Sequence, residues 1–295
     1  MKSTHDISLM TSLGLTSNIA TASTDKTFYY QRDLENYDSS KPILVVLHGY
    51  PQTHIHSHNP KFPSLPIAFS ASSPLIPLIL IGHDRSARIC HRLAVDFSNP
   101  PPNFGFNKKF ELKGTILLDI VPTLTQWQSM SDSRVSMGTF HWSFLANVEL
   151  ATAMIKAQGG DNWAKMCLDR WVGKSSAGQE KFKEHDAIEV YAEAFKVESV
   201  IRTTCDDYRA GAMEDPQLQE EDQREGRKIE SDVLVLFSKG YLGGWYDVEK
   251  VWSEWMGGNG RLEVHGIGRG VGHLLAEEEP EETAGVVRSF YERHM

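Results

Sequence analysis

The stretch from Leu78 to Arg88 reads LILIGHDRSAR, and it decides how the rest of the chain is interpreted. Its apolar run stops at Gly82, Asp84 follows two residues later, and small residues lead into a helix-like continuation. This order predicts a strand, a sharp turn and a helix, with the side chain of Asp84 at the turn. The pattern is that of a nucleophile elbow, whose usual form is Gly-x-Ser-x-Gly. Because the residue at the turn is an Asp, the covalent intermediate would be an alkyl ester. Such a nucleophile displaces a leaving group from carbon or opens a strained ring.

Further apolar runs of strand length lie on both sides of this stretch, and helix-like segments separate them. Strands are expected at 18–21, 26–32, 42–48, 75–81, 112–118, 232–238 and 261–264. Continuous apolar runs that alternate with helices are typical of an α/β fold with a mostly parallel, doubly wound sheet. The interval 124–228 is aromatic and helical without a strong strand. We therefore expect a core built from 1–123 and 229–295, with 124–228 inserted as a helical cap.

Length, charge and cysteine spacing limit the classes of function. A chain of 295 residues suffices for one large α/β domain with an inserted lid. The net charge of −9 and the absence of a dense basic cluster give no reason to expect a nucleic acid partner. No apolar run approaches the roughly 20 residues that span a bilayer, so no membrane partner is expected. Cys90, Cys167 and Cys205 form no Cys-x-x-Cys pair, which favours reduced thiols and a cytoplasmic protein.

The same reading predicts a small-molecule substrate, no cofactor and no metal. No cluster has metal-ligand spacing, and the glycine-rich pieces at 240–244 and 257–260 do not follow a phosphate-loop pattern. A homodimer is left open.

Three ionisable residues follow expected strands in an informative order. Asp84 comes after one strand, Asp119 after the next, and His273 late in the chain. Nucleophile, acid and base in this order are typical of the α/β-hydrolase triad. His273 would activate the water that hydrolyses the ester, and Asp119 would orient the imidazole. The backbone N–H groups of Tyr50 and Arg85 would form the oxyanion hole.

Several segments together resemble the fluoroacetate (haloacetate) dehalogenases of the α/β-hydrolase fold. They are LHGYPQTH (47–54), GHDRSAR (82–88), LDIVPT (118–123), FHW (140–142), DYRAG (207–211) and GHLLAEE (272–278). The similarity touches most of 43–290 apart from 55–77. It implies that Asp84 is the nucleophile, Asp119 the triad acid and His273 the base.

The resemblance also implies how a substrate would be held. Arg85 and Arg88 would bind the substrate carboxylate, and His141, Trp142 and Tyr208 would hold the departing halide. The guanidinium of an arginine binds a carboxylate through two parallel hydrogen bonds. Indole, phenol and imidazole groups donate hydrogen bonds to a developing anion.

An epoxide hydrolase is the nearest alternative, because it shares the Asp nucleophile and the His–Asp pair. Such enzymes use two lid tyrosines to protonate the ring oxygen. Tyr208 could be one, but His141-Trp142 stands where the other is expected. Two arginines beside the nucleophile are also unnecessary for a neutral epoxide. Asp247 is a rival for the triad acid. His48 and His83 are interpreted as hydrogen-bonding residues near the site.

The chain departs from the family between the His-Gly-Tyr-Pro turn and the elbow. Residues 52–81 contain five prolines, and one strand with its flanking helices is missing between residues 52 and 77. The N-terminal hairpin would then lose its docking strand, while 66–70 could be a remnant strand. A truncated, inactive α/β-hydrolase variant is therefore a further alternative.

Overall fold

The computed structural model describes residues 8, 10–12, 14–22, 25–38, 40–52 and 75–295. Two sheets are present in this part of the chain. A two-stranded antiparallel sheet pairs β1 (Thr16–Ala22) with β2 (Asp25–Gln31). A five-stranded parallel sheet has the order β3-β4-β5-β6-β7. The expected hairpin is thus confirmed, and it pairs with no strand of the main sheet among the described residues.

The main sheet consists of β3 (Ile43–Leu47), β4 (Ile76–His83), β5 (Phe110–Leu118), β6 (Asp232–Ser238) and β7 (Leu262–Ile267). Each expected strand is found, with ends that differ by up to three residues. Parallel pairing places the carboxyl ends of β3, β4, β5 and β6 at one edge of the sheet. The segments 48–52, 84, 119 and 239–247 leave the sheet at this edge, where open α/β sheets bind their ligands.

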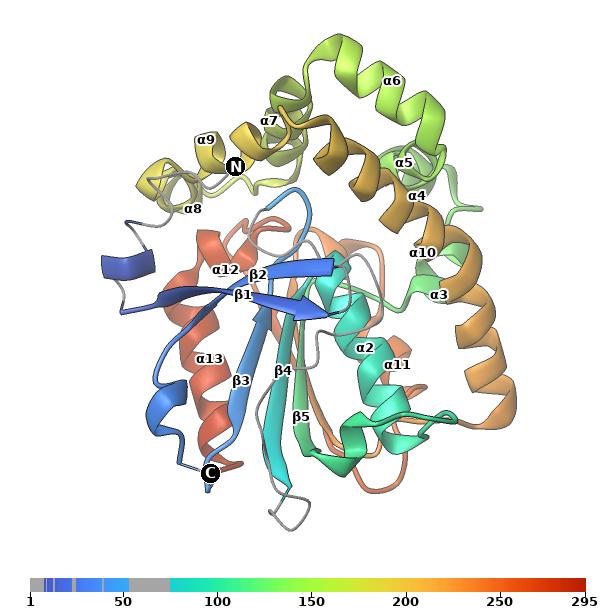
Figure 1. Ribbon diagram of the computed structural model, residues 1–295. Helices are drawn as coiled ribbons and strands as arrows, with labels where there is room; N and C mark the ends of the chain where they lie inside the picture. The colour runs from blue at the N-terminus through green and yellow to red at the C-terminus, as the bar shows by residue number, and fades with distance from the viewer. Residues whose placement is uncertain (1–7, 9, 13, 23–24, 39, 53–74) are drawn as a thin grey trace.

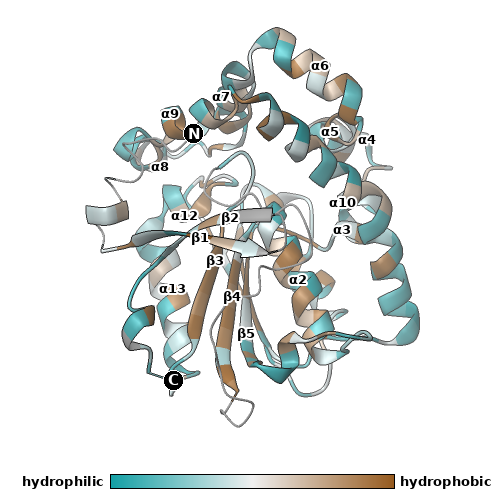
Figure 2. Ribbon diagram, in the orientation of Figure 1, coloured by the Kyte–Doolittle hydropathy of each residue, from teal (hydrophilic) through white to brown (hydrophobic). Residues whose placement is uncertain are grey.

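Helices cover both faces of this sheet (Figure 1). One face packs against α2 (Arg85–Ser98) and α11 (Val248–Ser253), and the other against α12 (Leu275–Glu278) and α13 (Pro280–Glu292). Successive residues of β4 alternate between the two cores: Leu78 and Leu80 face α2, whereas Ile79 and Ile81 face α13. Every residue of β4 is buried, and burial on both sides explains why this strand is a nearly continuous apolar run, most of which is brown in Figure 2.

Eight helices stand between β5 and β6, at the carboxyl edge of the sheet (Figure 1). They are α3 (Thr123–Ser129), α4 (Ser133–Gly138), α5 (His141–Ala146), α6 (Val148–Gln158), α7 (Gly160–Trp171), α8 (Ser176–Phe182), α9 (Ala187–Ala194) and α10 (Glu198–Glu225). Their apolar faces form a separate core that includes Trp142, Trp163, Trp171 and Tyr208, and this core also takes in Tyr50 from the turn after β3. The division into the domains 1–123, 124–228 and 229–295 stays a prediction.

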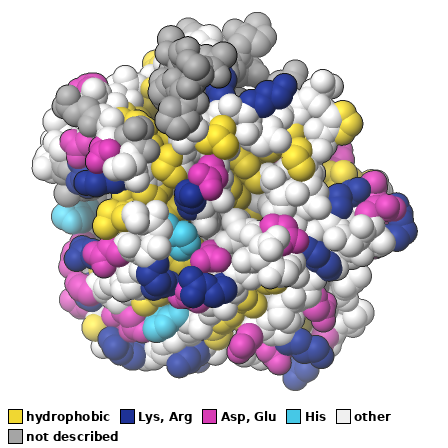
Figure 3. All heavy atoms as spheres, turned by 90° about the horizontal axis from the view of Figure 1, so that it is seen from below, with side chains coloured by type: hydrophobic (Ala, Val, Ile, Leu, Met, Phe, Trp, Pro, Cys, Tyr) yellow, Lys and Arg dark blue, Asp and Glu magenta, His cyan; other side chains and the backbone are white. Residues whose placement is uncertain are grey.

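Three further sequence expectations concern cysteines, membrane spans and the interval before the elbow. Cys90, Cys167 and Cys205 are buried and form no disulfide. Among the described residues, no helix is both long enough and apolar enough to cross a membrane. The missing strand and the proposed remnant at 66–70 fall within 53–74, outside the described residues. On the face seen in Figure 3, acidic and basic side chains are interspersed without a region of one sign.

Candidate active site

The turn between β4 and α2 holds Asp84 in a strained backbone conformation. Its φ is 49° and its ψ is −120°, a combination that non-glycine residues rarely adopt. Gly82 makes the turn possible, because a Cβ atom there would come within 2.6 Å of the backbone of Ala87. The chain therefore turns sharply and presents the side chain of Asp84 at the carboxyl edge of the sheet, as the sequence predicted.

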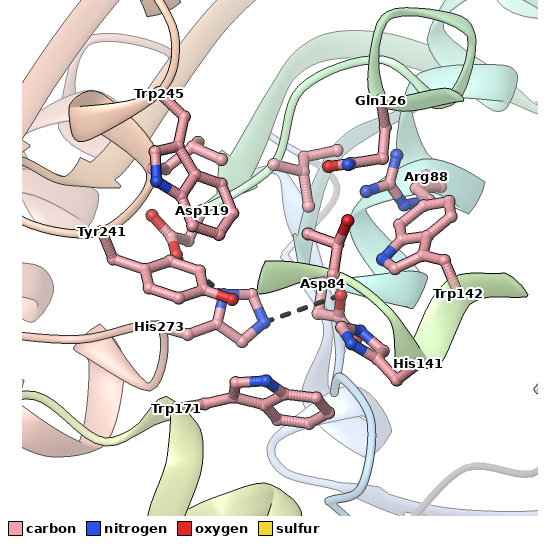
Figure 4. A pocket seen from close by; sticks show the side chains of 13 residues that line it. Asp84, Arg88, Asp119, Gln126, His141, Trp142, Trp171, Tyr241, Trp245 and His273 are labelled. Carbon is pink, nitrogen blue, oxygen red and sulfur yellow. Dashed lines mark hydrogen bonds and ion pairs between the residues drawn. The ribbon is translucent and has the colours of Figure 1, made fainter. Parts of the chain in front are cut away.

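Asp84, Asp119 and His273 meet at this edge. The Nδ1 of His273 lies 2.7 Å from the Oδ2 of Asp119, and its Nε2 lies 3.6 Å from the Oδ1 of Asp84. Figure 4 shows the imidazole between the two carboxylates. Ser238 donates a backbone hydrogen bond of 2.8 Å to Asp119 and so fixes the second carboxylate. The structure brings the three predicted catalytic residues together, and their catalytic roles stay a prediction.

The turn after β3 supplies one of the two predicted oxyanion-hole groups. The backbone N–H of Tyr50 donates a hydrogen bond of 3.1 Å to the Oδ2 of Asp84. Gly49 allows this approach, since a Cβ atom there would lie 2.8 Å from the Cβ of Asp84. The second predicted donor, the backbone N–H of Arg85, belongs to the first residue of α2, next to Asp84.

The charges of the three groups stabilise one another. Burial opposes ionisation of Asp84, but the close approach of His273 at 3.6 Å and the positive charges of His273 and Arg88 lower the pKa of Asp84 below its ordinary value. Burial likewise opposes protonation of His273, yet its hydrogen bond to Asp119 and its ion pair with Asp84 raise the pKa of His273 to about 10. In the resting site Asp84 is therefore an anion beside an imidazolium.

A cavity of about 30 Å³ opens onto Asp84 and His273 (Figure 4). It is lined by Asp84, Arg88, Asp119, Ile120, Gln126, Thr139, His141, Trp142, Trp171, Tyr241, Leu242, Trp245 and His273. A space of this size suits a substrate of few atoms. Arg88, His141 and Trp142 were expected to bind substrate and are in the lining, whereas Arg85 and Tyr208 are not.

The two arginines differ in their partners. Arg88 donates to the carbonyl of Val121 at 2.8 Å, and its guanidinium carbon lies 4.3 Å from the ring centroid of Trp142. Arg85 instead forms an ion pair of 2.6 Å with Asp207 of α10. Of the two expected carboxylate-binding arginines, the structure places only Arg88 in the lining.

Several buried polar atoms at and beside the cavity have no hydrogen-bond partner among the described residues. They are the Nε of Arg88, the Nδ1 of His141, the Nε1 of Trp171, the Nε2 of Gln126 and the hydroxyl of Tyr208. Unpaired buried polar groups are uncommon in native proteins and need an explanation. Most of these atoms are hydrogen-bond donors, and burial lowers the pKa of His141 to about 3, which leaves its ring neutral. Such an environment favours an anionic or electron-rich ligand.

The sequence did not indicate the other seven lining residues, which are Ile120, Gln126, Thr139, Trp171, Tyr241, Leu242 and Trp245. Tyr241 and Trp245 lie in the segment that leaves the carboxyl end of β6, so their position after a buried strand was a usable signal. Gln126 and Trp171 lie on the helices α3 and α7, where an isolated polar or aromatic residue gives no such indication.

The structure also shows the contacts of Asp247, the rival for the triad acid, and of His83. Asp247 caps α11 by accepting a hydrogen bond from the backbone of Lys250, so it is not the partner of His273. The Nδ1 of His83 lies 3.0 Å from the Oε1 of Gln52, and its Nε2 lies 2.9 Å from the carbonyl oxygen of His273. The prediction that His83 is a hydrogen-bonding neighbour of the site is confirmed.

No group of three or more His, Cys, Asp or Glu side chains in the described segments is placed to hold a metal ion.

Comparison with known proteins supports the fold and identifies a dehalogenase as a relative. A fluoroacetate dehalogenase from Burkholderia sp is 26% identical over 212 residues, which cover 72% of this chain and 62% of that protein. The match thus spans less than two thirds of the relative's length. No family model matches the chain.

Solved structures agree on the fold but differ in function. A candidate alpha/beta hydrolase from Nostoc sp PCC 7120 has a TM-score of 0.68 and 26% identity, with 94% of this chain and 98% of that chain covered. A candidate epoxide hydrolase from Pseudomonas aeruginosa has a TM-score of 0.70 and 22% identity, with 95% and 96% covered. A candidate acyltransferase from Salmonella enterica has a TM-score of 0.73 and 20% identity, with 96% of each chain covered. The chain therefore has the α/β-hydrolase fold, and the reaction must be argued from the site.

Proposed function

We propose that this protein, which has the α/β-hydrolase fold and hydrolases of that type among its homologues, is a hydrolytic dehalogenase of small haloacids such as haloacetate. The observation that supports this most directly is the ionised Asp84 beside His273, in a small cavity that also contains the guanidinium of Arg88. A serine hydrolase would have an uncharged nucleophile here and no need for a cation.

In the first step, a carboxylate oxygen of Asp84 attacks the carbon that bears the halogen. A C–O bond forms, the carbon–halogen bond breaks, and the halide leaves with the electron pair. Two negative groups must approach each other, since the substrate is itself a carboxylate. Arg88 lies in the cavity lining and offsets this repulsion, because its guanidinium binds the substrate carboxylate.

The departing halide is proposed to lie against His141 and Trp142, with Tyr208 behind them. The ring centroids of His141 and Trp142 lie 5.9 and 5.7 Å from that of Tyr208, so the three side chains form one cluster. Their N–H and O–H groups can stabilise negative charge as it develops on the halogen. This matters most for fluoride, which is a poor leaving group.

In the second step, water attacks the carbonyl carbon of the Asp84 ester, and His273 accepts the proton of that water. The oxyanion that forms lies near the backbone N–H of Tyr50, which already donates to the Oδ2 of Asp84. When the tetrahedral intermediate collapses, the bond between the carboxyl carbon of Asp84 and the ester oxygen breaks, and that oxygen leaves with the product carbon and takes a proton from His273. The oxygen of the attacking water replaces it in the carboxylate. Collapse releases a hydroxyacid and restores the Asp84 carboxylate.

Halide release tests this proposal. The purified protein is expected to liberate halide from fluoroacetate or chloroacetate, and Asp84→Asn is expected to abolish the release. A chain that unfolds cooperatively but releases no halide from either acid would contradict the proposal and favour the inactive variant.

An epoxide hydrolase remains the second candidate, because Tyr241 lines the cavity and the hydroxyl of Tyr208 has no partner among the described residues. Two such hydroxyls are the groups that would protonate an epoxide oxygen. Diol formation from an epoxide without halide release from any haloacid would select this reaction.

A further inference from the structure

The DYRAG segment of α10 (207–211) also contacts Arg85. The Nε of Arg85 donates to the Oδ2 of Asp207 at 2.6 Å, and its Nη2 donates to the carbonyl of Asp207 at 2.9 Å. The guanidinium lies against Gly211, where a Cβ atom would come within 2.7 Å of both Nη atoms. Two of the three nitrogens of Arg85 are thus held by one residue of a cap helix.

This arginine lies one side chain away from the cavity. Its guanidinium carbon is 5.5 Å from the ring centroid of Trp142, the same ring against which Arg88 packs at 4.3 Å. Trp142 lines the cavity. The third nitrogen of Arg85, Nη1, is buried and has no hydrogen-bond partner among the described residues. Both guanidinium groups therefore belong to the electrostatic surroundings of a bound anion.

A guanidinium that is only 8% exposed needs a nearby negative charge, because water cannot solvate it. Asp207 supplies that charge when no substrate is present. A substrate carboxylate would offer Arg85 the same planar pair of acceptors. Burial favours the neutral form of Asp215, the other α10 carboxylate near both arginines, by raising its pKa. Asp207 is therefore the main negative group that competes with a bound anion for Arg85.

We propose that Asp207 is the resident counter-ion of the anion site, a positioning residue that holds Arg85 and offsets its charge. An anionic substrate then meets only one guanidinium without an ion-pair partner among the described residues, that of Arg88. It binds less tightly than it would to two such guanidinium groups. Weaker binding of carboxylates also hastens release of the hydroxyacid product. The inference rests on the proposed function for the identity of the substrate as a carboxylate.

Chloroacetate binding to protein with Asp84→Asn tests the proposal, because this background cannot form the ester. Isothermal titration would compare it with the same protein bearing Asp207→Asn. We expect Asp207→Asn to tighten chloroacetate binding about tenfold, since one negative charge near the anion is removed. Neutral chloroacetamide should bind equally to both proteins, which a general loss of structure would not predict.

Asp206→Asn is the matched control. Asp206 is the preceding residue of the same helix, its side chain is 34% exposed like that of Asp207, and it pairs with Arg209 at 3.2 Å. We expect this variant to change chloroacetate binding by less than about twofold. Equal or weaker chloroacetate binding in Asp207→Asn would overturn the proposal, as would an equal gain in Asp206→Asn.

A second pair of variants changes chloroacetate affinity in the opposite direction. It stays informative if Asp207→Asn alone fails to fold because the buried Arg85 has lost its partner, since Arg85→Gln removes that buried cation. Arg85→Gln leaves Asp207 unpaired near the cavity and should weaken chloroacetate binding about tenfold. Adding Asp207→Asn to Arg85→Gln removes both charges and should restore most of that affinity. If the double variant binds as weakly as Arg85→Gln, Arg85 contacts the anion directly and the proposal is wrong.

These results separate the proposal from the function on which it rests. Tighter chloroacetate binding in Asp207→Asn, together with no halide release by the unmodified protein, would refute the dehalogenase but support the counter-ion. Halide release by the unmodified protein with no gain in Asp207→Asn would do the reverse. Absence of any chloroacetate binding in the Asp84→Asn protein would refute both.

Discussion

At the scale of single residues, the charge of Asp84 controls the protonation of His273. In the resting site, two carboxylates face one imidazole, and together they raise the pKa of His273 to about 10. An imidazolium cannot act as a base. Conversion of Asp84 into a neutral ester removes one of the two negative charges, so the pKa of His273 falls when a base is needed. In the proposed mechanism, ester formation would thereby switch His273 from a charge partner of Asp84 to a base.

A pH dependence follows for the two steps. Asp84 remains ionised well below pH 7 because its pKa is lowered, so ester formation continues in acid. Ester hydrolysis requires neutral His273 and should slow by about tenfold per pH unit below the pKa that His273 has in the ester form. We therefore expect the ester to accumulate as the pH is lowered from 8 to 5, measured by acid quenching and mass spectrometry. An ester fraction that does not change over this range would contradict the assignment of His273.

The residues that could be predicted from the sequence are those at strand ends. Asp84 and Asp119 directly follow apolar runs, and the chain order then selects His273. Arg88, His141 and Trp142 were expected only through the resemblance. The partner of Arg85 could not be predicted, because Asp207 lies 122 residues away and their contact depends on how α10 crosses the core.

At the scale of elements, the elbow depends on the absence of a side chain at Gly82. A methyl group there would meet backbone atoms of Ala87 at 2.6 Å, and backbone cannot move aside as a side chain could. We expect Gly82→Ala to lower the free energy of unfolding by about 1–3 kcal/mol and to reduce ester formation at least tenfold. Chemical denaturation and halide release measure the two effects.

Gly285→Ala is the control for this substitution, since a Cβ atom at that position of α13 would meet nothing within 4 Å. It should leave both quantities unchanged or raise the stability slightly, because alanine favours helix. A Gly82→Ala protein that equals Gly285→Ala in stability and activity would refute the role given to the close approach.

A second element-scale feature joins α9 to the turn after β3. Glu277 accepts hydrogen bonds of 2.5 Å from the hydroxyl of Tyr191 on α9 and from the side chain of Gln52. The Oε1 of Gln52 in turn accepts a hydrogen bond of 3.1 Å from the backbone N–H of Gly49. Burial raises the pKa of Glu277 from 4.5 to about 7 in spite of these bonds. The folded protein therefore binds a proton at Glu277 more tightly than the unfolded chain does.

Stability should consequently fall as the pH rises from about 4.5 to above 7, because native Glu277 must be ionised in its buried position. Linkage gives a loss of about 1–3 kcal/mol attributable to this group. Glu277→Gln cannot ionise and should lack this loss, which urea unfolding at pH 5 and pH 8 would measure. The exposed Glu249→Gln is the control and should follow the unmodified protein. A Glu277→Gln protein whose stability changes with pH as the unmodified protein's does would refute the assignment.

The strands β4 and β6 were predictable as elements because burial on both faces leaves a nearly uninterrupted apolar run. The ends of the helices between β5 and β6 were harder to predict from the sequence, since many of these helices begin without a capping side chain. Asp132 and Ser175 cap α4 and α8, whereas α5, α6 and α7 begin without one. Tertiary packing, rather than local sequence, sets those ends.

At the scale of the whole molecule, the main sheet has an unpaired edge in the described part of the chain. β3 pairs with β4 on one side only, and its side chains at Leu44 and Val46 are 42% and 61% exposed. The β1–β2 hairpin forms its own sheet instead of extending this edge. Free strand edges with apolar side chains promote association between chains. Asp84, Asp119 and His273 lie in the segments after β4, β5 and β7, so the edge strand is separate from the residues that are proposed to be catalytic.

Val46→Thr should therefore reduce concentration-dependent association by about twofold or more, measured by light scattering. Threonine keeps the branched shape that suits a strand and removes apolar surface. Leu150→Gln on α6 is the control, because Leu150 is 58% exposed but lies on the cap. An equal effect of both substitutions would show that general surface polarity, and not the edge of β3, governs association.

The central claim is that the carboxylate of Asp84 becomes covalently alkylated. The most direct test is mass spectrometry of the Asp84 peptide from a His273→Gln protein after exposure to chloroacetate, since this variant should form the ester but fail to hydrolyse it. We predict a mass increase of one carboxymethyl group on Asp84 and one equivalent of chloride per protein. Chloride release without any adduct on Asp84, or an adduct on another residue, would contradict the account.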